Sequence, residues 1–455
     1  MANQIAQHLL HDMNNGVTTI DGQPMVFHCN HYNRNLQHTI ENCRHIDNQT
    51  LLVHSAAEVA FLGLHEHFKA HPELDLGQRL TYAEDLYSYC GFGLLPLTDC
   101  AAQSGALSDI TLSTSSSHYG RALQLNFEKR RGPGEYFDLG FTIGALSAAF
   151  DSPFGGELTS SAISLKGNRT GFKLAPYDEE YRYLFQLKVD LRQYESAPGV
   201  RSEISPRFAD VQTDVDEDAV IAAVSQAPLF GNEHGLIPAF GVELARQYAD
   251  YYNLISYRFE QNLSAALEKR PSLNDLLVYD YPALFHYQRY TDLEGMNLTR
   301  CLLTEAGHIC GFNTMGGIMS SDTWDELLMP MIQNREDWLH GIIAVINALG
   351  WGIWRVVELI PNEKLVLRVW RPYESLGYLR WFGQADRPVD YLVAGVAASL
   401  MNLLYVGDIT QRPNLDLDYY HQINRAPESF WGEQVKCVAM GDEYSEVVVT
   451  RRKRV

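Results

Sequence analysis

One segment near the N-terminus concentrates side chains that can do chemistry. It reads FHCNHYNRNLQHTIENCRHI (residues 27–46), with Cys29 placed between His28 and His31. An isolated thiol has a pKa of about 8.5, and a neighbouring imidazole can lower that pKa and later return the proton. The spacing predicts a nucleophile at Cys29 with His28 or His31 as its base. His31 is the better partner if a helix begins near Cys29.

A second interpretation of the same segment is a metal or haem site. Residues three, four and seven positions apart share a face of a helix, so His38, Glu41 and His45 follow His31 along one stripe. Imidazole together with carboxylate suits iron, zinc or manganese. Because the stretch from 31 to 45 would cover about 20 Å of helix, further ligands would have to come from elsewhere. A helix that is simply solvated, or that lines an interface, is the ordinary alternative.

Four residues further along are candidates for substrate binding: Tyr32, His54, Glu58 and Tyr87. His54 and Glu58 lie one helical turn apart and could flank a cavity, although a surface ion pair is the simpler explanation. Tyrosine combines an aromatic body with a polar tip, which suits a small-molecule pocket, and it is also common in cores.

The chain that must position these residues repeats itself once. PMVFHCNHYN (24–33) resembles PALFHYQRYT (282–291), which places His28 opposite His286. CGFGLLPLTD and LGWGIWRVVE then place one Gly-aromatic-Gly corner opposite another, at an offset of about 259 residues. The second copy lacks most of the histidines of the first. We therefore expect two copies of one fold, of which the earlier carries the working site.

Each copy shows the same order of elements. Helical segments precede the Gly-aromatic-Gly corner, at 31–46, 55–69 and 79–90 in the first copy and at 289–306, 315–333 and 335–349 in the second. Alternating apolar and polar residues then predict strands, the first of them over 94–100, and a small-residue helix and a hairpin follow. Between the copies, apolar residues at three- and four-residue spacing predict an amphipathic helix over 242–269. The fold class predicted is α+β, with two copies of an antiparallel sheet backed by helices and related by a pseudo-twofold axis. The expected division is an N-terminal copy over 1–175, a linker with amphipathic helices over 176–275, and a C-terminal copy over 276–455.

Composition restricts the partners and the compartment. The 455 residues carry a formal net charge of -20, which repels phosphate backbones and argues against nucleic acid. No apolar run is long enough to cross a bilayer, and the first residues do not resemble a signal peptide. Seven cysteines at irregular spacing indicate reduced thiols in a cytoplasmic protein. A small-molecule substrate is the expected partner, and a homodimer is compatible with the pattern.

The closing segment EQVKCVAMGDEYSEVVV (433–449) resembles the final hairpin of 4-vinyl reductase-type small-molecule-binding domains. The FHC motif is similar to proteins grouped with 2-aminothiazoline-4-carboxylate hydrolase. The resemblance implies a four-stranded antiparallel sheet backed by helices, with a ligand cavity between them. Sensing members of the family bind zinc through a Glu and two Cys, and the matching positions here are Gln434, Cys437 and Ser445. Because one of these three ligands is present, no zinc is expected at Cys437.

Three functions remain open from the sequence. The favoured one is an enzyme that hydrolyses or cyclises a C–N or C–S bond of a small polar metabolite with Cys29, His28 and His31. An iron- or haem-dependent oxidative enzyme using His38, Glu41 and His45 is the first alternative. A non-catalytic small-molecule-binding or scaffold protein is the second.

Overall fold

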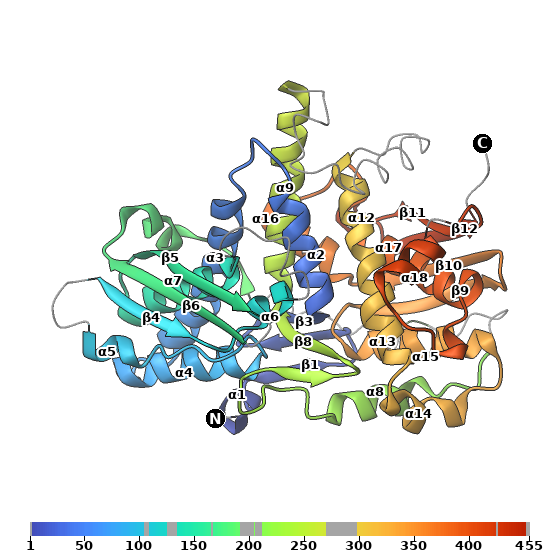
Figure 1. Ribbon diagram of the computed structural model, residues 1–455, viewed down its shortest axis with the longest axis horizontal. Helices are drawn as coiled ribbons and strands as arrows, with labels where there is room; N and C mark the ends of the chain where they lie inside the picture. The colour runs from blue at the N-terminus through green and yellow to red at the C-terminus, as the bar shows by residue number, and fades with distance from the viewer. Residues whose placement is uncertain are drawn as a thin grey trace.

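Three antiparallel sheets, each covered by helices, make up an α+β fold (Figure 1). The computed structural model describes residues 2–103, 109–124, 134–164, 167–191, 204, 212–269, 298–424 and 426–451. A three-stranded sheet with the order β4-β6-β5 lies in the first half of the chain, and a four-stranded sheet with the order β11-β12-β10-β9 lies in the second. The third sheet, β1-β2-β3-β8-β7, joins strands from both halves.

The first half contributes a hairpin, a helical layer and a sheet. Its elements are α1 (Ala2–Ala6), β1 (Leu9–Asp12), β2 (Val17–Ile20), β3 (Gln23–Cys29), α2 (Asn30–Glu41), α3 (Asn48–Ala70), α4 (Leu76–Tyr89), α5 (Asp99–Gln103), β4 (Ile110–Thr114), α6 (His118–Gln124), α7 (Tyr136–Phe150), β5 (Phe154–Ser164), β6 (Gly167–Pro176) and the 3-10 helix η3 (Glu179–Gln186).

The second half repeats that order, with a fourth strand in its outer sheet. Its elements are α8 (Glu217–Gln226), β7 (Ile237–Ala239), β8 (Val242–Tyr248), α9 (Ala249–Lys269), α12 (Leu298–Cys310), η5 (Gly311–Met315), α13 (Gly316–Met319), α14 (Asp322–Leu327), η6 (Met329–Met331), α15 (Arg335–Ala348), β9 (Ile353–Ile360), β10 (Lys364–Trp370), α16 (Tyr373–Phe382), α17 (Tyr391–Met401), η7 (Asn402–Val406), η8 (Ile409–Gln411), α18 (Leu417–Asn424), β11 (Phe430–Lys436), η9 (Val438–Met440) and β12 (Ser445–Arg451).

Backbone conformation shows which elements of the two halves are equivalent. The β2–β3 turn contains Asp21 at φ +50° followed by Gly22 at φ +77°, and the β7–β8 turn contains Phe240 at φ +54° followed by Gly241 at φ +72°. The strands that leave these turns, β3 and β8, pair with each other in the central sheet, with Phe27 opposite Arg246. The second copy therefore includes residues 217–269, which differs from the sequence-based division that assigned 176–275 to a linker. The sequence match at 282–291, including His286, lies outside the described residues.

Each copy packs its Gly-aromatic-Gly corner against the hairpin of the other copy. The amide of Gly93 donates to the carbonyl of Gly235 at 2.8 Å, and the amide of Gly352 donates to the carbonyl of Gly16 at 3.1 Å. The next contact is also reciprocal: Phe27 N donates to Leu349 O at 3.3 Å, and Arg246 N donates to Cys90 O at 2.8 Å. This exchange ties the two halves into one unit through backbone hydrogen bonds.

Helix pairs pack behind the two outer sheets. α7 lies along α3, and α17 lies along α12 (Figure 1). The α3–α7 contact is close because a Cβ atom at Gly140 would lie 2.3 Å from the carbonyl oxygen of Val53. At the equivalent crossing, a Cβ at Gly395 would lie 2.2 Å from the carbonyl oxygen of Thr304. The small-residue helices of the two copies thus let backbones approach more closely than larger side chains would allow.

Local sequence signals explain where several helices begin. α4 starts with a capping box in which Asp75 and Gln78 satisfy each other's backbone amides, and its counterpart α15 starts with a capping box of Asn334 and Asp337. α3 begins after Asp47, whose side chain accepts from the amide of Thr50. The two capping boxes fix the starts of α4 and α15, the helices that carry the Gly-aromatic-Gly corners at their C-terminal ends.

Several predicted elements differ from those in the structure. The stretch 242–269, predicted as a continuous helix, begins as strand β8 and becomes helix α9 only at Ala249. Residues 94–100, predicted as a strand, form none, and the last two of them begin helix α5. The helix predicted for 31–46 ends at Glu41, and the helix predicted for 315–333 is broken into α13, α14 and η6. In each case pairing or packing with a distant segment decides the outcome.

All seven cysteines are free thiols with buried side chains. Among the described residues, no helix combines the length and the apolar character needed to cross a membrane.

The contact between the hairpin and the corner can be tested by comparing two glycines with similar backbone angles. At Gly235 (φ +65°) a Cβ would lie 1.9 Å from the carbonyl oxygen of Gly93, whereas at Gly241 (φ +72°) nothing lies within 4 Å. Gly241→Ala should cost about 1–2 kcal/mol, the strain of a left-handed alanine. Gly235→Ala should cost more than about 3 kcal/mol, because the exchanged backbone must also move. Urea unfolding of both variants measures the difference, and equal losses would contradict the proposed contact.

Candidate functional site

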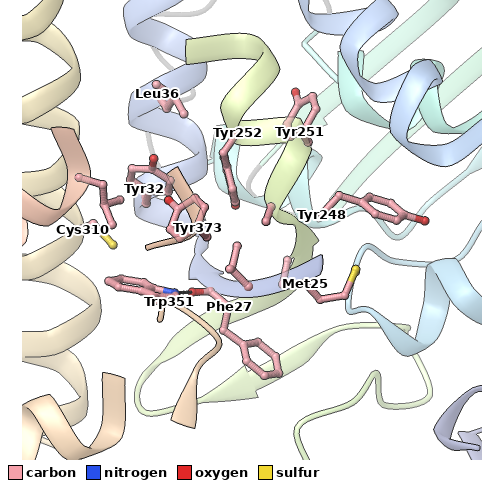
Figure 2. Close-up of a cluster of buried hydrophobic side chains, with 14 of the residues drawn as sticks. Met25, Phe27, Tyr32, Leu36, Tyr248, Tyr251, Tyr252, Cys310, Trp351 and Tyr373 are labelled. Carbon is pink, nitrogen blue, oxygen red and sulfur yellow. Dashed lines mark hydrogen bonds between the residues drawn. The ribbon is translucent and has the colours of Figure 1, made fainter. Parts of the chain in front are cut away.

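His28 lies at the centre of the molecule, on strand β3, with no exposed surface. Its ring stacks between Tyr32 and Trp351, with centroid distances of 4.3 and 4.7 Å. The edge of the ring faces Tyr252. Trp351 is held in turn by its indole N–H, which donates to the carbonyl of Phe27 at 3.1 Å (Figure 2). The imidazole is therefore fixed in position by aromatic packing on both faces.

Both ring nitrogens of His28 have polar partners. Nδ1 lies 3.4 Å from the thiol sulfur of Cys310, and Nε2 lies 3.2 Å from the hydroxyl of Tyr373. Tyr373 also hydrogen-bonds to the hydroxyl of Tyr32. The arrangement that uses every proton has the thiol donating to Nδ1, Nε2–H donating to Tyr373, and Tyr373 donating to Tyr32. It is a continuous path for protons from Cys310 to Tyr32.

A second thiol lies on the far side of Cys310. Thr314 links the two, since its hydroxyl donates to the sulfur of Cys29 at 2.8 Å and lies 3.6 Å from the sulfur of Cys310. Cys29 is the N-cap residue of α2, so its thiol also lies at the positive end of a helix. Two thiols, one hydroxyl and one imidazole thus form a single hydrogen-bonded group.

Burial keeps the members of this group neutral. It lowers the pKa of His28 well below its usual value and raises the pKa of the Cys310 thiol well above its own. Burial also raises the pKa of Cys29, although Thr314 and the first amides of α2 oppose the shift. The resting state is therefore a thiol beside a neutral imidazole, not the pre-formed thiolate that the sequence suggested for Cys29.

The two copies both contribute to this group. His28, Cys29 and Tyr32 come from the first copy, whereas Cys310 and Tyr373 come from the second. The pseudo-symmetric position to His28 on strand β8 is Gln247, whose side-chain amide donates to the hydroxyl of Tyr119 at 2.9 Å. The site is thus built between the copies, and an amide takes the place of the imidazole at the pseudo-symmetric position.

The other histidines of the first segment lie away from this group. His31 is partly exposed on α2, and burial followed by the charge of Arg34 lowers its pKa. α2 ends at Glu41, and His45 is exposed at a left-handed φ of +64°. His38, Glu41 and His45 therefore do not form one helical stripe, and the structure does not bring their ligand atoms together as a metal-binding group among the described residues.

The four predicted substrate-binding residues are dispersed. Tyr32 belongs to the central group, as described above. Nε2 of His54 lies 3.1 Å from a carboxylate oxygen of Glu180. Glu58 is buried and forms a two-point ion pair with Arg258 of α9, at 2.8 and 3.2 Å. Because their partners differ, His54 and Glu58 act in separate contacts.

Tyr87, the fourth candidate, belongs to a buried acidic site in the first copy. Its hydroxyl donates to Asp138 Oδ1 at 2.7 Å, and the hydroxyl of Ser117 donates to Oδ2. Burial raises the pKa of Asp138 to about 7, despite these two hydrogen bonds. A carboxyl group that changes charge near neutral pH is unusual in a core and gives this site its own pH response.

The positions that match the family's zinc ligands converge on one carboxylate. Asp390 accepts hydrogen bonds from Gln434 at 2.6 Å and from Ser445, and the sulfur of Cys437 lies 3.7 Å away. Ser375 donates to the same group at 2.7 Å. Burial raises the pKa of Cys437 to about 11. Asp390 and Cys437 are the two donors of the kind that zinc prefers in this group, and an amide and two hydroxyls complete it, so the set does not fit zinc, which needs about four anionic or imidazole donors.

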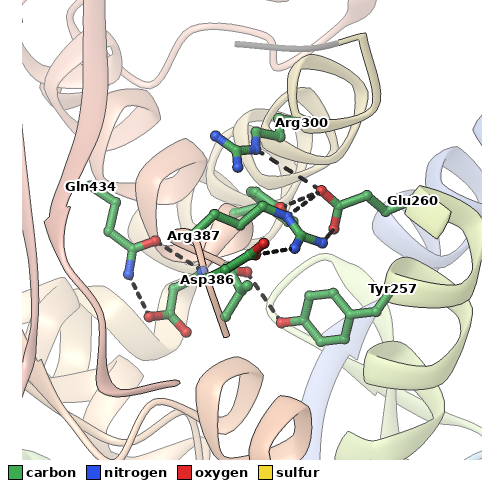
Figure 3. A network of polar contacts seen from close by, with 9 residues as sticks. Tyr257, Glu260, Arg300, Asp386, Arg387 and Gln434 are labelled. Atoms are coloured by element: carbon green, nitrogen blue, oxygen red, sulfur yellow. Dashed lines mark hydrogen bonds and ion pairs between the residues drawn. The ribbon is translucent and has the colours of Figure 1, made fainter. Parts of the chain in front are cut away.

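A network of charged side chains lies in the same region of the second copy. Glu260 forms a two-point contact with Arg387 at 2.9 and 3.0 Å, and the hydroxyl of Tyr391 also donates to it. Figure 3 shows this pair, with Arg300 also facing Glu260. The network links α9 to the loop before α17 and needs no ligand to satisfy its charges.

Sequence reasoning missed the second-copy half of the central group: Cys310, Thr314, Trp351 and Tyr373. Trp351 had a usable signal, since it is the aromatic residue of the Gly-Trp-Gly corner. Cys310 had none, because neither its neighbours nor its spacing connects it to His28, 282 residues earlier.

Comparisons with known proteins are sparse. No protein-family model and no curated protein matches the chain. One solved structure with some similarity is the phenol-responsive sensory domain of the transcription activator PoxR with phenol. The match has a TM-score of 0.25 and 12% identity, and it covers 39% of this chain and 77% of that chain. We draw no conclusion about fold or function from a similarity of this size.

The raised pKa of Asp138 predicts a specific pH dependence of stability. In the unfolded chain this carboxyl ionises near 3.8, whereas in the folded protein it keeps its proton up to about 7. Stability should therefore fall as the pH rises from about 4 to about 7, by at most about 4 kcal/mol from this group. Asp138→Asn should flatten that fall. Denaturant unfolding at several pH values measures it, with Asp109→Asn as an exposed control. A fall of the same size in both variants would show that Asp138 is not its source.

Proposed function

We propose that the chain is a small-molecule enzyme that hydrolyses or cyclises a C–N or C–S bond at the group formed by His28, Cys310 and Tyr373. The observation that supports this most directly is the imidazole of His28, which contacts a thiol through one nitrogen and a tyrosine hydroxyl through the other. A nucleophile, a base and a residue that orients the base are the parts required for nucleophilic catalysis.

The chemistry assigned to this group conserves protons and bonds. The sulfur of Cys310 attacks an electrophilic carbon while Nδ1 of His28 takes the thiol proton, and the C–N or C–S bond of the substrate breaks. The imidazolium returns the proton to the leaving nitrogen or sulfur. The attacked carbon is an acyl carbon, so the intermediate is a thioester. In hydrolysis water adds to this thioester, and in cyclisation an internal amine or thiol of the substrate adds to it; in both cases His28 takes the proton of the attacking group and returns it to the sulfur of Cys310 as the C–S bond breaks. Tyr373 holds the ring in the tautomer that leaves Nδ1 free to accept.

Neutral resting groups determine how such a mechanism would work. Because burial raises the pKa of Cys310 and lowers the pKa of His28, the proton must move during the attack and not before it. This resembles activation of a serine by a histidine more than a stored thiolate. Cys29 and His31, the pair suggested by the sequence, stay a prediction, and Cys29 is connected to the proposed nucleophile through Thr314.

A substrate would have to enter beside the tyrosines. His28, Cys29, Cys310 and Trp351 have no exposed surface, whereas Tyr32 and Tyr373 are 4% and 5% exposed. Rotation of these tyrosines is the smallest movement that would expose the imidazole and the thiol.

A non-catalytic small-molecule-binding protein is the second candidate. The neutral, stacked aromatic surroundings of His28 favour it, since such a site can bind a planar ring and hydrogen-bond one polar substituent without any reaction. We also propose a cytoplasmic location, in keeping with seven free thiols. A homodimer stays a prediction.

Turnover of a defined panel of compounds tests the enzyme proposal. The purified protein is incubated with small thiazolines, lactams, amides and thioesters, and the products are followed by mass spectrometry. We expect turnover of at least one class, and a loss of about 10³-fold or more in both Cys310→Ser and His28→Gln. Cys301→Ser is the matched control, because Cys301 is equally buried on the same helix, α12, outside the group.

Three results would count against the proposal. Full activity in Cys310→Ser would remove that thiol as the nucleophile, and a loss in Cys29→Ser alone would transfer the role to Cys29. Tight binding of a panel compound with no product, abolished by His28→Gln, would favour the non-catalytic alternative.

A further inference from the structure

A second group of ligand-type side chains lies at the edge of the first copy, away from the His28 group. It contains His8, which follows α1, Asp21 in the β2–β3 turn, and His67 near the end of α3. The three elements are far apart in sequence and meet only in the folded chain. Of the described residues, these three form the group of His, Cys, Asp or Glu whose ligand atoms all lie within 4.8 Å of one another.

The distances in this group suit a metal ion. Nδ1 of His8 lies 3.0 Å from Asp21 Oδ1, and Nδ1 of His67 lies 3.1 Å from the same oxygen. Ligand bonds of about 2.0–2.2 Å to one ion, placed at about 90–100° to each other, separate neighbouring donor atoms by about 3 Å. A small shift of Asp21 would bring all three donor atoms within bonding distance of one ion, all on one side of that ion.

We propose that His8, Asp21 and His67 bind a divalent transition-metal ion. Two imidazoles and one carboxylate form a donor set that suits Fe²⁺, Mn²⁺, Co²⁺ or Zn²⁺ and leaves further positions for water or a small ligand. Without the ion, both imidazoles share one carboxylate oxygen through their Nδ1 atoms. With the ion, each ring carries its proton on Nε2 and binds through Nδ1.

Neighbouring residues hold the donors in place. Tyr82 on α4 donates its hydroxyl to Asp21 Oδ2, which leaves Oδ1 turned toward the two imidazoles. Its ring stacks on His67 with a centroid distance of 3.8 Å and an angle of 10°. Such outer contacts are characteristic of metal sites, where they orient the ligands.

Accessibility is graded across the group. The side chain of His67 is 5% exposed, that of Asp21 12% and that of His8 28%. His71, with its ring 4.7 Å from that of His67, lies on the outer side. An ion could therefore enter past His8 without unfolding the core.

The second copy shows that the fold does not require this group. The turn that matches Asp21 holds Phe240 in the same left-handed conformation, at φ +54° against +50°. The carboxylate is thus not needed to form the turn. A role in binding explains why a charged residue with two imidazole partners lies at this position in one copy only.

Metal titration of the full chain tests the proposal. Protein freed of metal with a chelator is titrated with Co²⁺, followed by its absorption spectrum, and with Zn²⁺, followed by calorimetry. We expect one ion per chain and a rise in melting temperature on binding. His8→Gln and Asp21→Asn should each weaken binding by about 100-fold or more, since changes to outer-shell residues alone cost about 10–100-fold.

The controls separate the site from general effects. His54→Gln removes an imidazole that also faces a carboxylate, at 3.1 Å, but has no second histidine in its group, so metal affinity should not change. His8→Gln alters the most exposed ligand and should fold normally, which circular dichroism checks. Absence of binding at millimolar metal, or unchanged affinity in both His8→Gln and Asp21→Asn, would overturn the proposal.

Discussion

Close contact between the hairpin of one copy and the glycine corner of the other is the constraint on which this structure depends. At both corners the contact is made by backbone atoms: the amide of Gly93 donates a hydrogen bond to Gly235, and the amide of Gly352 donates one to Gly16. A single Cβ atom at Gly16 would lie 2.7 Å from the backbone of Gly352. Because each copy completes the other, the two halves form one folding unit despite their separate outer sheets.

This exchange decides the composition of the central group. Strand β3 places His28 against Trp351 of the second copy. The indole N–H of Trp351 donates a hydrogen bond to the carbonyl of Phe27. The imidazole therefore meets a thiol and a hydroxyl from the second copy. Burial at such a junction makes charge costly, which is why the thiols and the imidazole all stay neutral. Chemistry at this place would depend on proton transfer between neutral partners.

The two halves have kept the same backbone while their polar groups diverged. Capping boxes start both α4 and α15, and left-handed glycines occupy both corners. Polar side chains follow no such symmetry. Gln247 occupies the position in β8 that is equivalent to His28, and Phe240 occupies the position that is equivalent to Asp21. Symmetric positions thus serve the fold, whereas the positions that differ carry the imidazoles and carboxylates from which both proposals are built.

The sequence by itself determined what depends on local patterns. The alternation of apolar and polar residues predicted β9 over 353–360 and predicted β10 to within one or two residues. Runs of small residues predicted the positions of α7 and α17. The fold class, antiparallel sheets backed by helices, was predicted correctly. His28, Cys29 and Tyr32 were identified from their residue types and spacing.

Only the tertiary structure decided which residues meet. VELARQY became strand β8 and not helix because β3 offered it a pairing edge, and His45 left the predicted stripe because α2 ends at Glu41. Cys310 contacts His28, which lies 282 residues earlier in the chain. His8 and His67 both contact Asp21 in the β2–β3 turn. Local propensity acts over a few residues, whereas these contacts are set by packing between segments that carry no mark of their partners in the sequence.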